Sequence, residues 1–359
     1  MRDILSTLVP GEAGYPRNHW YVAAYSHEVS EQPLSRTLLG KPVVLFRDEQ
    51  GKAVALFDRC PHRGMPLSPG EVVKGAIQCP YHGMEFDGSG RCVHIPSSPD
   101  WIPERMSVTS YPLVEDWQFL WIWLGDPELA DPTTLPDLAH WGFGQEDWFS
   151  EPAVRLEVAA NYLLPIENLL DATHITFLHK GQIDQGLVAS HPFEVEVDGR
   201  LIRVTRILKR EKQSPLTMKT FGFKGEHADR SIVAETLLPA LCGIRIEIRA
   251  SDDPEAPPQI NQLAVGITPS DQNSCYQFTA VAQTFPFLNE QRNDDLRQLL
   301  MEDVTALEQI QRLHDRLTSE QRLEFSVKSD EAAMRARRVL AYQIAEERDR
   351  LAGKTGLTG

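Results

Sequence analysis

The chain has 359 residues, of which 42% are hydrophobic and 24% are charged, and its formal net charge is −15. This length is sufficient for two domains with separate cores, and the composition is typical of a globular protein. The acidic balance argues against a nucleic-acid-binding protein, which needs basic side chains to displace counterions from phosphates. No run of about 18 apolar residues predicts a transmembrane helix, so we expect no membrane association.

The N-terminal segment and the cysteines indicate the compartment. The first twenty residues contain neither an apolar signal core nor a small-residue cleavage site, which predicts a cytoplasmic protein. The five cysteines are an odd number, widely spread, in a chain too large to need disulfides for stability. We therefore expect reduced cysteines, and metal binding where cysteine and histidine are closely spaced.

The first third of the chain predicts a small all-β unit. Strands are expected at His19–Ala24, Lys41–Arg47 and Trp117–Leu124, which are rich in β-branched and aromatic residues. The third of these segments is apolar on both faces, so we expect it to be buried. The acidic, proline-rich segment Gly125–Leu138 then predicts an exposed connection between domains. We accordingly place one domain at residues 1–138 and a second at residues 139–359.

The second domain is predicted to be α+β, because strands are followed by helices. A helical pattern at Pro165–Lys180 comes first, and two helices end the chain, at Asn293–Leu317 and from Ser329 to near Gly353. The strands predicted between them include Phe193–Val197, Leu201–Ile207, Gly243–Ala250 and Tyr276–Phe285.

Two short segments of the predicted β unit each combine a cysteine with a histidine. Cys60 and His62 lie in one segment, and Cys79 and His82 lie in the other. Thiolates are typical ligands of iron–sulfur clusters, and imidazole ligands on one iron raise the reduction potential. A structural zinc site is the alternative. However, zinc motifs usually pair cysteine with cysteine and histidine with histidine, whereas each segment here is mixed.

A second candidate metal site follows in the predicted helix at Pro165–Lys180. Asp171, His174 and His179 form the pattern D-x-x-H-x-x-x-x-H. The first two, three residues apart, share one face of a regular helix. The two histidines would be about 140° apart on such a helix, so they can bind one ion only if the helix is distorted, for example by a π-type turn. Two satisfied core histidines are the alternative.

A third ligand is predicted in the helix at Asn293–Leu317. Its apolar stripe comprises Leu296, Leu299, Leu300, Val304, Leu307 and Ile310. Asp303 falls within this stripe, whereas Glu302 is expected to point elsewhere. A carboxylate facing a core is costly unless it is paired or bound to metal, and the alternative is an acid at the solvated margin of the stripe. Two histidines and one carboxylate form a facial triad, which holds Fe(II) with open positions for O₂ and substrate.

The sequence around both candidate sites resembles the oxygenase (α) subunits of Rieske non-heme iron oxygenases. The stretch RCPHRG…QCPYHGMEFDGSGRC is similar to the cluster-binding segment of that family. NHWYVAAY, WQFLWIWLGDP, ENLLDATH and EDVTALEQIQ resemble the single-subunit monooxygenases typified by the dicamba and vanillate O-demethylases. The resemblance implies an N-terminal all-β Rieske [2Fe-2S] domain and a C-terminal helix-grip domain, an antiparallel sheet with helices that holds a mononuclear iron.

The resemblance also assigns roles to individual residues. The implied ligands are Cys60, His62, Cys79 and His82 for the cluster, and His174, His179 and Asp303 for the mononuclear Fe(II). Asp171 matches the carboxylate that links an iron-site histidine to a cluster histidine of the neighbouring subunit. Asn168 matches a polar position beside the iron, and the sequence leaves open whether it binds iron, supports a ligand or caps the helix.

The implied reaction consumes O₂ and two electrons per turnover. A separate ferredoxin or flavin reductase would draw these electrons from NAD(P)H, because the chain has no G-x-G-x-x-G segment after a strand. The resemblance implies monooxygenation of a small aromatic substrate in a homotrimer, with O- or N-dealkylation or hydroxylation as the outcome. Ring cis-dihydroxylation is the alternative among enzymes. A Rieske electron carrier and a helix-grip binding protein are the alternatives in other classes.

The sequence does not identify the substrate-binding residues. By resemblance, they are expected between about residues 200 and 295. Arg245 and Arg249 are candidate partners for an anionic substrate, with solvated arginines on a strand face as the alternative. The sequence therefore leaves both a neutral aromatic compound and an aromatic acid open as substrates.

Overall fold

The computed structural model describes residues 14–355 except 185, 223, 224, 226, 254, 256, 289, 319 and 323, and only the main chain of residues 351–355. The described residues form two compact units. The N-terminal unit comprises residues 17–135 and 268–271, and the C-terminal unit comprises residues 14–16, 136–267 and 272–355. The division falls after residue 135, near the predicted boundary at 138. The domain ranges 1–138 and 139–359 stay a prediction.

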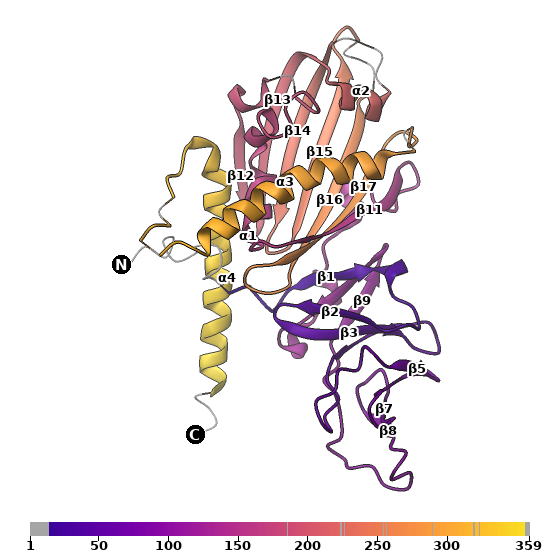
Figure 1. Cartoon of the computed structure of the whole chain (residues 1–359). Helices are drawn as coiled ribbons and strands as arrows, with labels where there is room; N and C mark the ends of the chain where they lie inside the picture. Colours follow the sequence, from indigo (N-terminus) through magenta and orange to yellow (C-terminus); the bar gives the residue numbers. More distant parts are fainter. Residues whose placement is uncertain are drawn as a thin grey trace. The chain divides into compact units, whose positions relative to one another are not determined.

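The N-terminal unit contains three small sheets (Figure 1). Their strands, in sheet order, are β1 (Trp20–Tyr25), β10 (Phe119–Trp123) and β9 (Leu113–Asp116); β2 (Leu34–Leu38), β3 (Lys41–Arg47) and β4 (Ala53–Phe57); and β5 (Glu71–Val73), β6 (Ala76–Gln78), β7 (Glu85–Phe86) and β8 (Cys92–His94). The prediction for β3 is confirmed at both ends, and the other two predicted strands correspond to β1 and β10. All residues of β10 are buried, as its two-sided apolar pattern predicts.

The acidic, proline-rich connection forms short 3₁₀ turns. Pro127–Leu129 and Pro132–Thr134 are two such turns, and each is preceded by an aspartate. The side chain of Asp126 accepts a hydrogen bond from the amide of Glu128, and that of Asp131 accepts one from the amide of Thr133 (2.8 Å). Aspartate at the N-cap followed by proline is a favourable start for a helical turn, which explains the composition of this segment.

The C-terminal unit is built on a seven-stranded sheet. Its strands, in sheet order, are β11 (Phe149–Val158), β17 (Cys275–Gln283), β16 (Gln259–Pro269), β15 (Leu241–Ala250), β14 (His227–Leu237), β13 (Leu201–Lys212) and β12 (Glu194–Asp198). The strand pairs from β12 to β16 are antiparallel, and so is the pair of β11 and β17. The four strands predicted by name correspond to β12, β13, β15 and β17, whereas β11, β14 and β16 were not specified from sequence.

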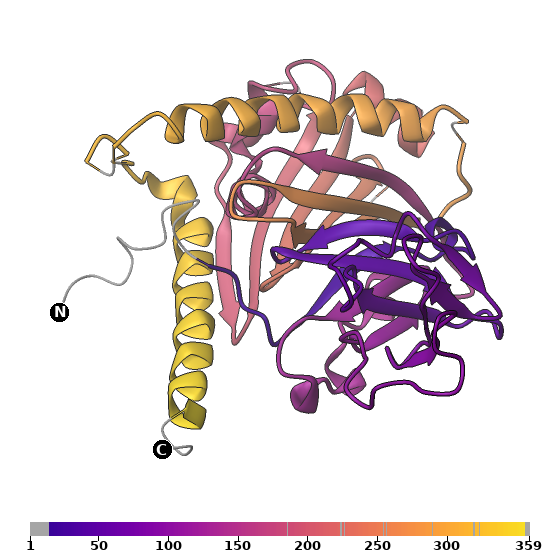
Figure 2. The same ribbon diagram turned by 60° about the horizontal axis from the view of Figure 1, so that its bottom comes forward.

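Helices cover one face and one edge of this sheet. Helix α3 (Arg292–His314) lies across one face, and helix α4 (Glu331–Thr355) packs on α1 (Leu163–Leu170) and on the β12–β13 edge (Figures 1 and 2). A short helix, α2 (Pro215–Phe221), follows β13. Residues Leu300, Val304 and Leu307 of α3 belong to the same core as the strands, α1 and α4. Because these side chains are buried, one face of α3 packs against the sheet, and Asp303 is buried on the same helix.

One prediction about the surface of helix α3 can be compared with the structure. Ile310, predicted as part of the buried stripe of α3, is 41% exposed, so this part of the prediction is wrong. Ile310 lies near the end of α3, beyond Leu307, the last apolar residue of this helix in the sheet core.

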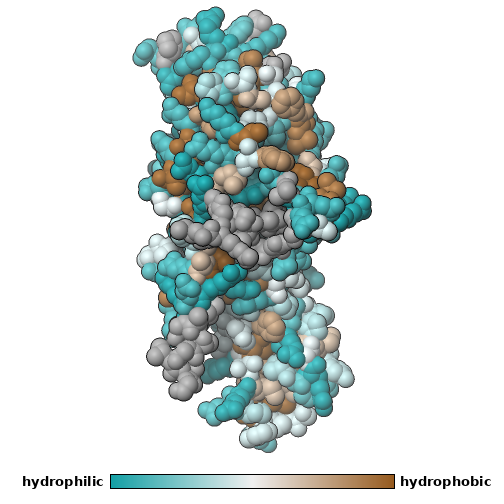
Figure 3. Space-filling model, turned by 90° about the vertical axis from the view of Figure 1, so that its left-hand side faces the viewer, coloured by the Kyte–Doolittle hydropathy of each residue, from teal (hydrophilic) through white to brown (hydrophobic). Residues whose placement is uncertain are grey.

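On the face shown in Figure 3, described hydrophobic and hydrophilic residues are intermixed. No helix among the described residues is long and apolar enough to cross a membrane.

Candidate metal centres

Two loops of the N-terminal unit carry the predicted cluster ligands, and both have the same main-chain hydrogen bonds. The amide of Gly64 donates to the carbonyl of Cys60 (2.9 Å), and the amide of Gly83 donates to the carbonyl of Cys79 (3.0 Å). In each loop the cysteine amide also donates to the carbonyl five residues later, at 2.8 Å. The glycines have φ angles of +79° and +69°, a region that side chains with a Cβ rarely adopt. Each loop is therefore a tight turn around its cysteine.

The four predicted ligands are grouped as like pairs. The Cys60 and Cys79 side chains are buried and neighbouring; burial, together with the Cys79 thiol, raises the pKa of Cys60 to about 11. The exposed rings of His62 and His82 lie with their centroids 4.7 Å apart. A pair of sulfur donors beside a pair of nitrogen donors fits a [2Fe-2S] cluster with two cysteines on one iron and two histidines on the other.

This grouping also bears on the zinc alternative. A single tetrahedral zinc ion would bring all four donor atoms to one point. Among the described residues, the group whose donor atoms all lie within 4.8 Å of one another is instead His174, His179 and Asp303. The separated thiol and imidazole pairs therefore fit a two-iron cluster better than one ion.

A buried aspartate, which the sequence did not reveal, supports the first cluster loop. The carboxylate of Asp58 accepts hydrogen bonds from the amides of Leu67 (2.6 Å) and Ser68 (2.8 Å). It also accepts one from the Ser68 hydroxyl, at 2.6 Å. Asp58 is only 6% exposed and precedes Cys60 by two residues. These bonds tie the two ends of the loop together across the cluster ligands.

The second candidate site begins where the predicted helix at Pro165–Lys180 breaks. Helix α1 ends at Leu170, because Asp171 adopts an extended conformation with φ −107° and ψ 96°. A 3₁₀ segment, Ala172–Thr176, follows, and the side chain of Asp171 caps it. The helix is therefore distorted, as the spacing of the two histidines requires, but by a break and a 3₁₀ segment and not by a π-type turn. His179 lies beyond the 3₁₀ segment, so the break in the helix lets both histidines approach one point.

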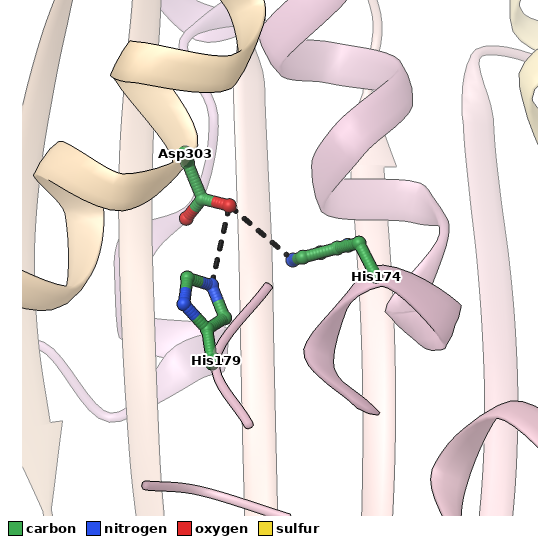
Figure 4. A group of neighbouring side chains, drawn as sticks. All are labelled: His174, His179 and Asp303. Carbon is green, nitrogen blue, oxygen red and sulfur yellow. Dashed lines mark ion pairs between the residues drawn. The ribbon is translucent and has the colours of Figure 1, made fainter. Parts of the chain in front are cut away.

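The structure brings His174, His179 and Asp303 together within the C-terminal unit. One carboxylate oxygen, Oδ1 of Asp303, lies 3.5 Å from Nε2 of His174 and 3.2 Å from Nε2 of His179 (Figure 4). Asp303 is 8% exposed, so the prediction that it faces inward from α3 is confirmed. Two imidazole nitrogens and one carboxylate oxygen that converge in this way fit the donor set of a mononuclear non-heme iron.

The surroundings affect the two imidazoles differently. Burial lowers the pKa of His174, although the Asp303 charge opposes this effect. Burial alone would also lower the pKa of His179, but hydrogen bonds and charges from Asp303 and Glu302 outweigh it and raise that pKa. Because an imidazole must be neutral to bind metal, metal binding and protonation compete at His179.

Glu302 contacts an imidazole of the site, so the expectation that it points elsewhere is wrong. Its Oε2 lies 2.8 Å from Nδ1 of His179, and its Oε1 accepts a hydrogen bond from Nε2 of Gln182 (2.7 Å). A carboxylate on Nδ1 places the proton there and leaves Nε2, which faces Asp303, as the metal-binding atom. The only sign of this role of Glu302 in the sequence was its position next to Asp303.

Two further predicted residues lie beside the triad. Nδ2 of Asn168 donates to Oδ1 of Asp303 (3.2 Å), so this side chain supports a predicted ligand from α1. The main-chain carbonyl of Asp171 lies 2.5 Å from Nδ1 of His174. The carboxylate of Asp171 instead accepts from the amide and hydroxyl of Thr173, at 2.9 and 2.7 Å. Within this chain, the orientation of His174 is therefore set by the carbonyl of Asp171 rather than by its carboxylate.

A cavity of about 180 Å³ borders the triad. His174, His179 and Asp303 form part of its wall. Most of the remaining wall is apolar and includes Ile232, Ile244, Ile246, Leu263, Leu296 and Leu300. Arg245 is absent from the described wall and lies 3.6 Å from the carboxylate of Glu247. Arg249 is absent from it as well.

Comparison with known proteins agrees with both metal centres. Residues 19–112 match the Rieske [2Fe-2S] domain, and residues 158–346, more than half of the chain, match the vanillate O-demethylase oxygenase C-terminal domain. The chain is 33% identical to the dicamba O-demethylase oxygenase component of Stenotrophomonas maltophilia, over 90% of this chain and 96% of that protein. It is 30% identical to the chloroacetanilide N-alkylformylase oxygenase component of Rhizorhabdus wittichii, over 92% and 96% of the two chains.

The solved structures agree with these relatives. The structure of dicamba monooxygenase bound to 3,6-dichlorosalicylic acid matches with a TM-score of 0.87 and 31% identity, over 93% of this chain and 99% of that one. The predicted α+β class, with an all-β Rieske domain and a helix-grip domain, is thereby confirmed. The relatives are components of demethylase and dealkylase systems, which supports monooxygenation over ring dihydroxylation. The chain belongs to the dicamba and vanillate O-demethylase family of Rieske non-heme iron oxygenases, as the oxygenase component of a monooxygenase system that uses a [2Fe-2S] cluster, a mononuclear iron and O₂.

Proposed function

We propose that the cavity beside His174, His179 and Asp303 binds a small aromatic substrate for oxidative O- or N-dealkylation or hydroxylation. The observation that carries this proposal is that the wall of an otherwise largely apolar cavity includes the three converging donor atoms. Iron bound there supplies the O₂ chemistry. The apolar side chains exclude water and hold the ring, while Glu302 and the Asp171 carbonyl fix the two imidazoles.

The expected outcome depends on the substituent that lies nearest the donors. Insertion of one oxygen atom into a C–H bond next to an ether oxygen gives a hemiacetal, and insertion next to an amine nitrogen gives a carbinolamine. Either product loses its alkyl group as an aldehyde. The second oxygen atom of O₂ leaves as water, with two electrons and two protons from outside the substrate. At a C–H bond without a neighbouring heteroatom, the same step gives a stable alcohol.

The electrons are proposed to enter at Cys60, Cys79, His62 and His82 of the N-terminal unit. A separate ferredoxin or flavin reductase supplies them from NAD(P)H in the cytoplasm. By the family resemblance, the cluster of one subunit serves the mononuclear iron of the next, in a homotrimer, with Asp171 between them. Exposure of the His62 and His82 rings supports this role, because an electron carrier or a neighbouring subunit can reach them.

The test is a single-turnover experiment with ¹⁸O₂, pre-reduced protein and a panel of methoxy-, N-alkyl- and alkyl-substituted aromatic compounds. The wild-type protein is expected to place one ¹⁸O atom in the aldehyde released from a methoxy or N-alkyl compound, trapped before it exchanges with water, or in the alcohol formed from an alkyl compound. It should contain about three iron atoms per chain. Asp303→Ala is expected to lose turnover and retain about the two iron atoms of the cluster.

The matched control is Glu308→Ala, on the same helix. The side chain of Glu308 accepts a hydrogen bond from the amide of Ala159 at 3.1 Å, and it is not among the three converging donors. We expect this variant to retain full iron content and activity. Product formation by Asp303→Ala would refute the assignment of the triad, and incorporation of two ¹⁸O atoms would refute monooxygenation.

A further inference from the structure

The central strands of the sheet provide one side of the cavity wall, and they do so with alternate residues, as expected for one face of a sheet. Ile232 and Ala234 of β14, Ile244 and Ile246 of β15, and Leu263 of β16 contribute apolar side chains. Within the described parts of these three strands, the polar side chains of the wall are Arg230 and Asn261. Arg230 and Asn261 are therefore the polar groups that these three strands offer to a bound substrate.

Arg230 faces two carboxylates, which neutralise its charge. Its guanidinium lies 2.7 Å from the carboxylate of Glu211 and 3.7 Å from that of Asp184, and all three side chains are nearly inaccessible. Burial alone would raise the pKa of Asp184, but the Thr176 hydroxyl and nearby amides outweigh it and lower that pKa. Asp184 is therefore charged and matches Arg230. A second guanidinium nitrogen donates to the carbonyl of Ile183 (2.8 Å).

The other cation in the wall, Arg292, is paired as well. Its guanidinium forms an ion pair with Glu151 and stacks on the ring of Phe287, with 3.7 Å from the guanidinium carbon to the ring centroid. Among the described wall residues, each arginine thus has a carboxylate partner. Away from the triad, an anionic substrate would therefore lose its hydration in an apolar cavity without meeting an arginine that lacks a carboxylate partner, which is unfavourable.

Asn261 has one polar atom without a partner. The Nε2 atom of Gln283 donates to the carbonyl of Phe285 (2.9 Å), and this bond orients the Gln283 amide. The Oε1 atom of Gln283 must then accept, and Nδ2 of Asn261 donates to it (3.2 Å). This leaves Oδ1 of Asn261 without a hydrogen-bond donor among the described residues. Asn261 is 7% exposed and lines the cavity, so a substrate bound there could donate a hydrogen bond to this oxygen.

We propose that the cavity selects an uncharged aromatic substrate that donates an N–H or O–H hydrogen bond to Asn261, and that it discriminates against aromatic carboxylates and sulfonates. This inference rests on the proposed function, because it takes the cavity beside the triad as the substrate site. Asn261 is then a specificity-determining residue. The paired arginines disfavour binding of an anion, and the unpartnered Oδ1 atom of Asn261 favours a substrate that donates a hydrogen bond.

The test uses three probes of nearly equal shape: 3-methoxybenzamide, methyl 3-methoxybenzoate and 3-methoxybenzoate. Their binding to the iron-loaded oxygenase is measured by calorimetry without O₂, so that the readout does not depend on turnover. We expect the amide, a neutral donor, to bind about tenfold more tightly than the ester, which is neutral without a donor. The carboxylate should bind more weakly than the ester.

Two variants separate the two parts of the proposal. Asn261→Leu should abolish the preference for the amide over the ester without weakening the ester, whereas Thr220→Val, a change elsewhere in the wall, should preserve it. Asp184→Asn removes the charged partner of Arg230 and should strengthen carboxylate binding by about tenfold. Thermal unfolding of each variant checks that the C-terminal unit is folded. If Asp184→Asn fails to fold, Asn261→Leu still tests whether the substrate donates a hydrogen bond at this position.

Equal binding of the three probes, tightest binding of the carboxylate, or an unchanged amide preference in Asn261→Leu would overturn the proposal. These outcomes are distinguishable from failure of the proposed function. If any of the three probes is oxygenated and this activity requires Asp303, the proposed function holds, whichever probe binds most tightly.

Discussion

The two proposed cluster loops and the proposed mononuclear triad place their predicted ligands in different ways. Each cluster loop supplies a cysteine and a histidine from a few consecutive residues, and hydrogen bonds within the loop set its shape. The triad combines His174 and His179 with Asp303, which comes from a helix far along the chain and is held by packing on the sheet. The first site depends mainly on local turn chemistry, and the second depends on the tertiary fold.

This difference predicts how each site responds to change. A local site should lose its metal when a ligand or a loop hydrogen bond is removed, with little effect on the other unit. A site that depends on tertiary packing should also respond to residues that never touch the metal but hold its ligands. The four predictions below test this comparison, in order of the expected effect on metal retention.

The largest effect is expected from Cys60→Ser, which removes a thiolate that we propose binds the cluster. Since the [2Fe-2S] cluster needs both cysteines, the protein should lose its brown colour and the EPR signal of the reduced cluster. About one iron atom per chain should remain, bound in the C-terminal unit. Cys92→Ser is the matched control, because Cys92 is buried in the same core but is not a predicted ligand. Loss of the mononuclear iron together with the cluster would show that the sites are not independent.

A smaller effect is expected from Asp58→Ala. This change leaves the amides of Leu67 and Ser68 without their buried acceptor, and unsatisfied groups of this kind cost about 1–3 kcal/mol each. We expect the cluster absorbance to bleach at a temperature several degrees lower, since about 1 kcal/mol shifts Tm by roughly 2–8 °C in domains of about 60 to 250 residues. Asp87→Ala removes a comparable turn contact at an exposed site and should shift the transition less. Equal shifts would contradict a special role for Asp58.

Glu302→Gln tests support of the triad from a residue outside it. The carboxylate of Glu302 lies on Nδ1 of His179, and loss of such a partner typically weakens metal binding by about 10–100-fold. Competition with a chelator measures this change, while the cluster spectrum should stay constant. Glu308→Gln, on the same helix, is the control. Unchanged iron affinity in Glu302→Gln would mean that ligand geometry alone holds the ion.

Asp171→Asn should have the smallest effect on iron binding. Because Nδ1 of His174 contacts the main-chain carbonyl of Asp171, and asparagine caps a helical turn about as well as aspartate, iron affinity should stay within about threefold. If the carboxylate bridges the two metals between subunits, the pre-reduced cluster should nevertheless fail to reoxidise in a single turnover. Thr173→Val, which alters the same cap but keeps the carboxylate, should retain transfer. Normal reoxidation in Asp171→Asn would rule out the bridge.

The same contrast explains how much could be predicted from sequence. The cluster ligands are visible as two short motifs because their geometry is local. Asp303 could be predicted because apolar residues recur at regular helical spacing on both sides of it. A distortion of this helix was expected from the spacing of the two histidines, but its position after Leu170 was not, because the end of the helix depends on the backbone of one residue, Asp171. Glu302 was missed because a helical stripe gives the direction of Cβ and not the reach of a long side chain.

The residues of the cavity could not be predicted for a different reason. Arg230 and Asn261 lie on β14 and β16, and only the order of the strands brings their side chains to one face of the sheet. Their charges and hydrogen bonds depend in turn on Glu211 and Gln283, which belong to other strands. Sequence spacing carries no information about these pairings, so the chemistry of the pocket becomes visible only in the fold.

Helix α3 carries both Asp303 and part of the cavity wall, including Leu296 and Leu300. This shared support has a consequence for directed evolution of the enzyme. Replacing Leu296 or Leu300 to accommodate a new compound also shifts the helix that positions the Asp303 carboxylate. A variant that accepts a larger substrate would therefore also lose iron. Replacements at Ile244 or Leu263, on strands that carry no ligand, reshape the cavity without moving a donor atom. Libraries aimed at new compounds should therefore vary the strands and leave this helix intact.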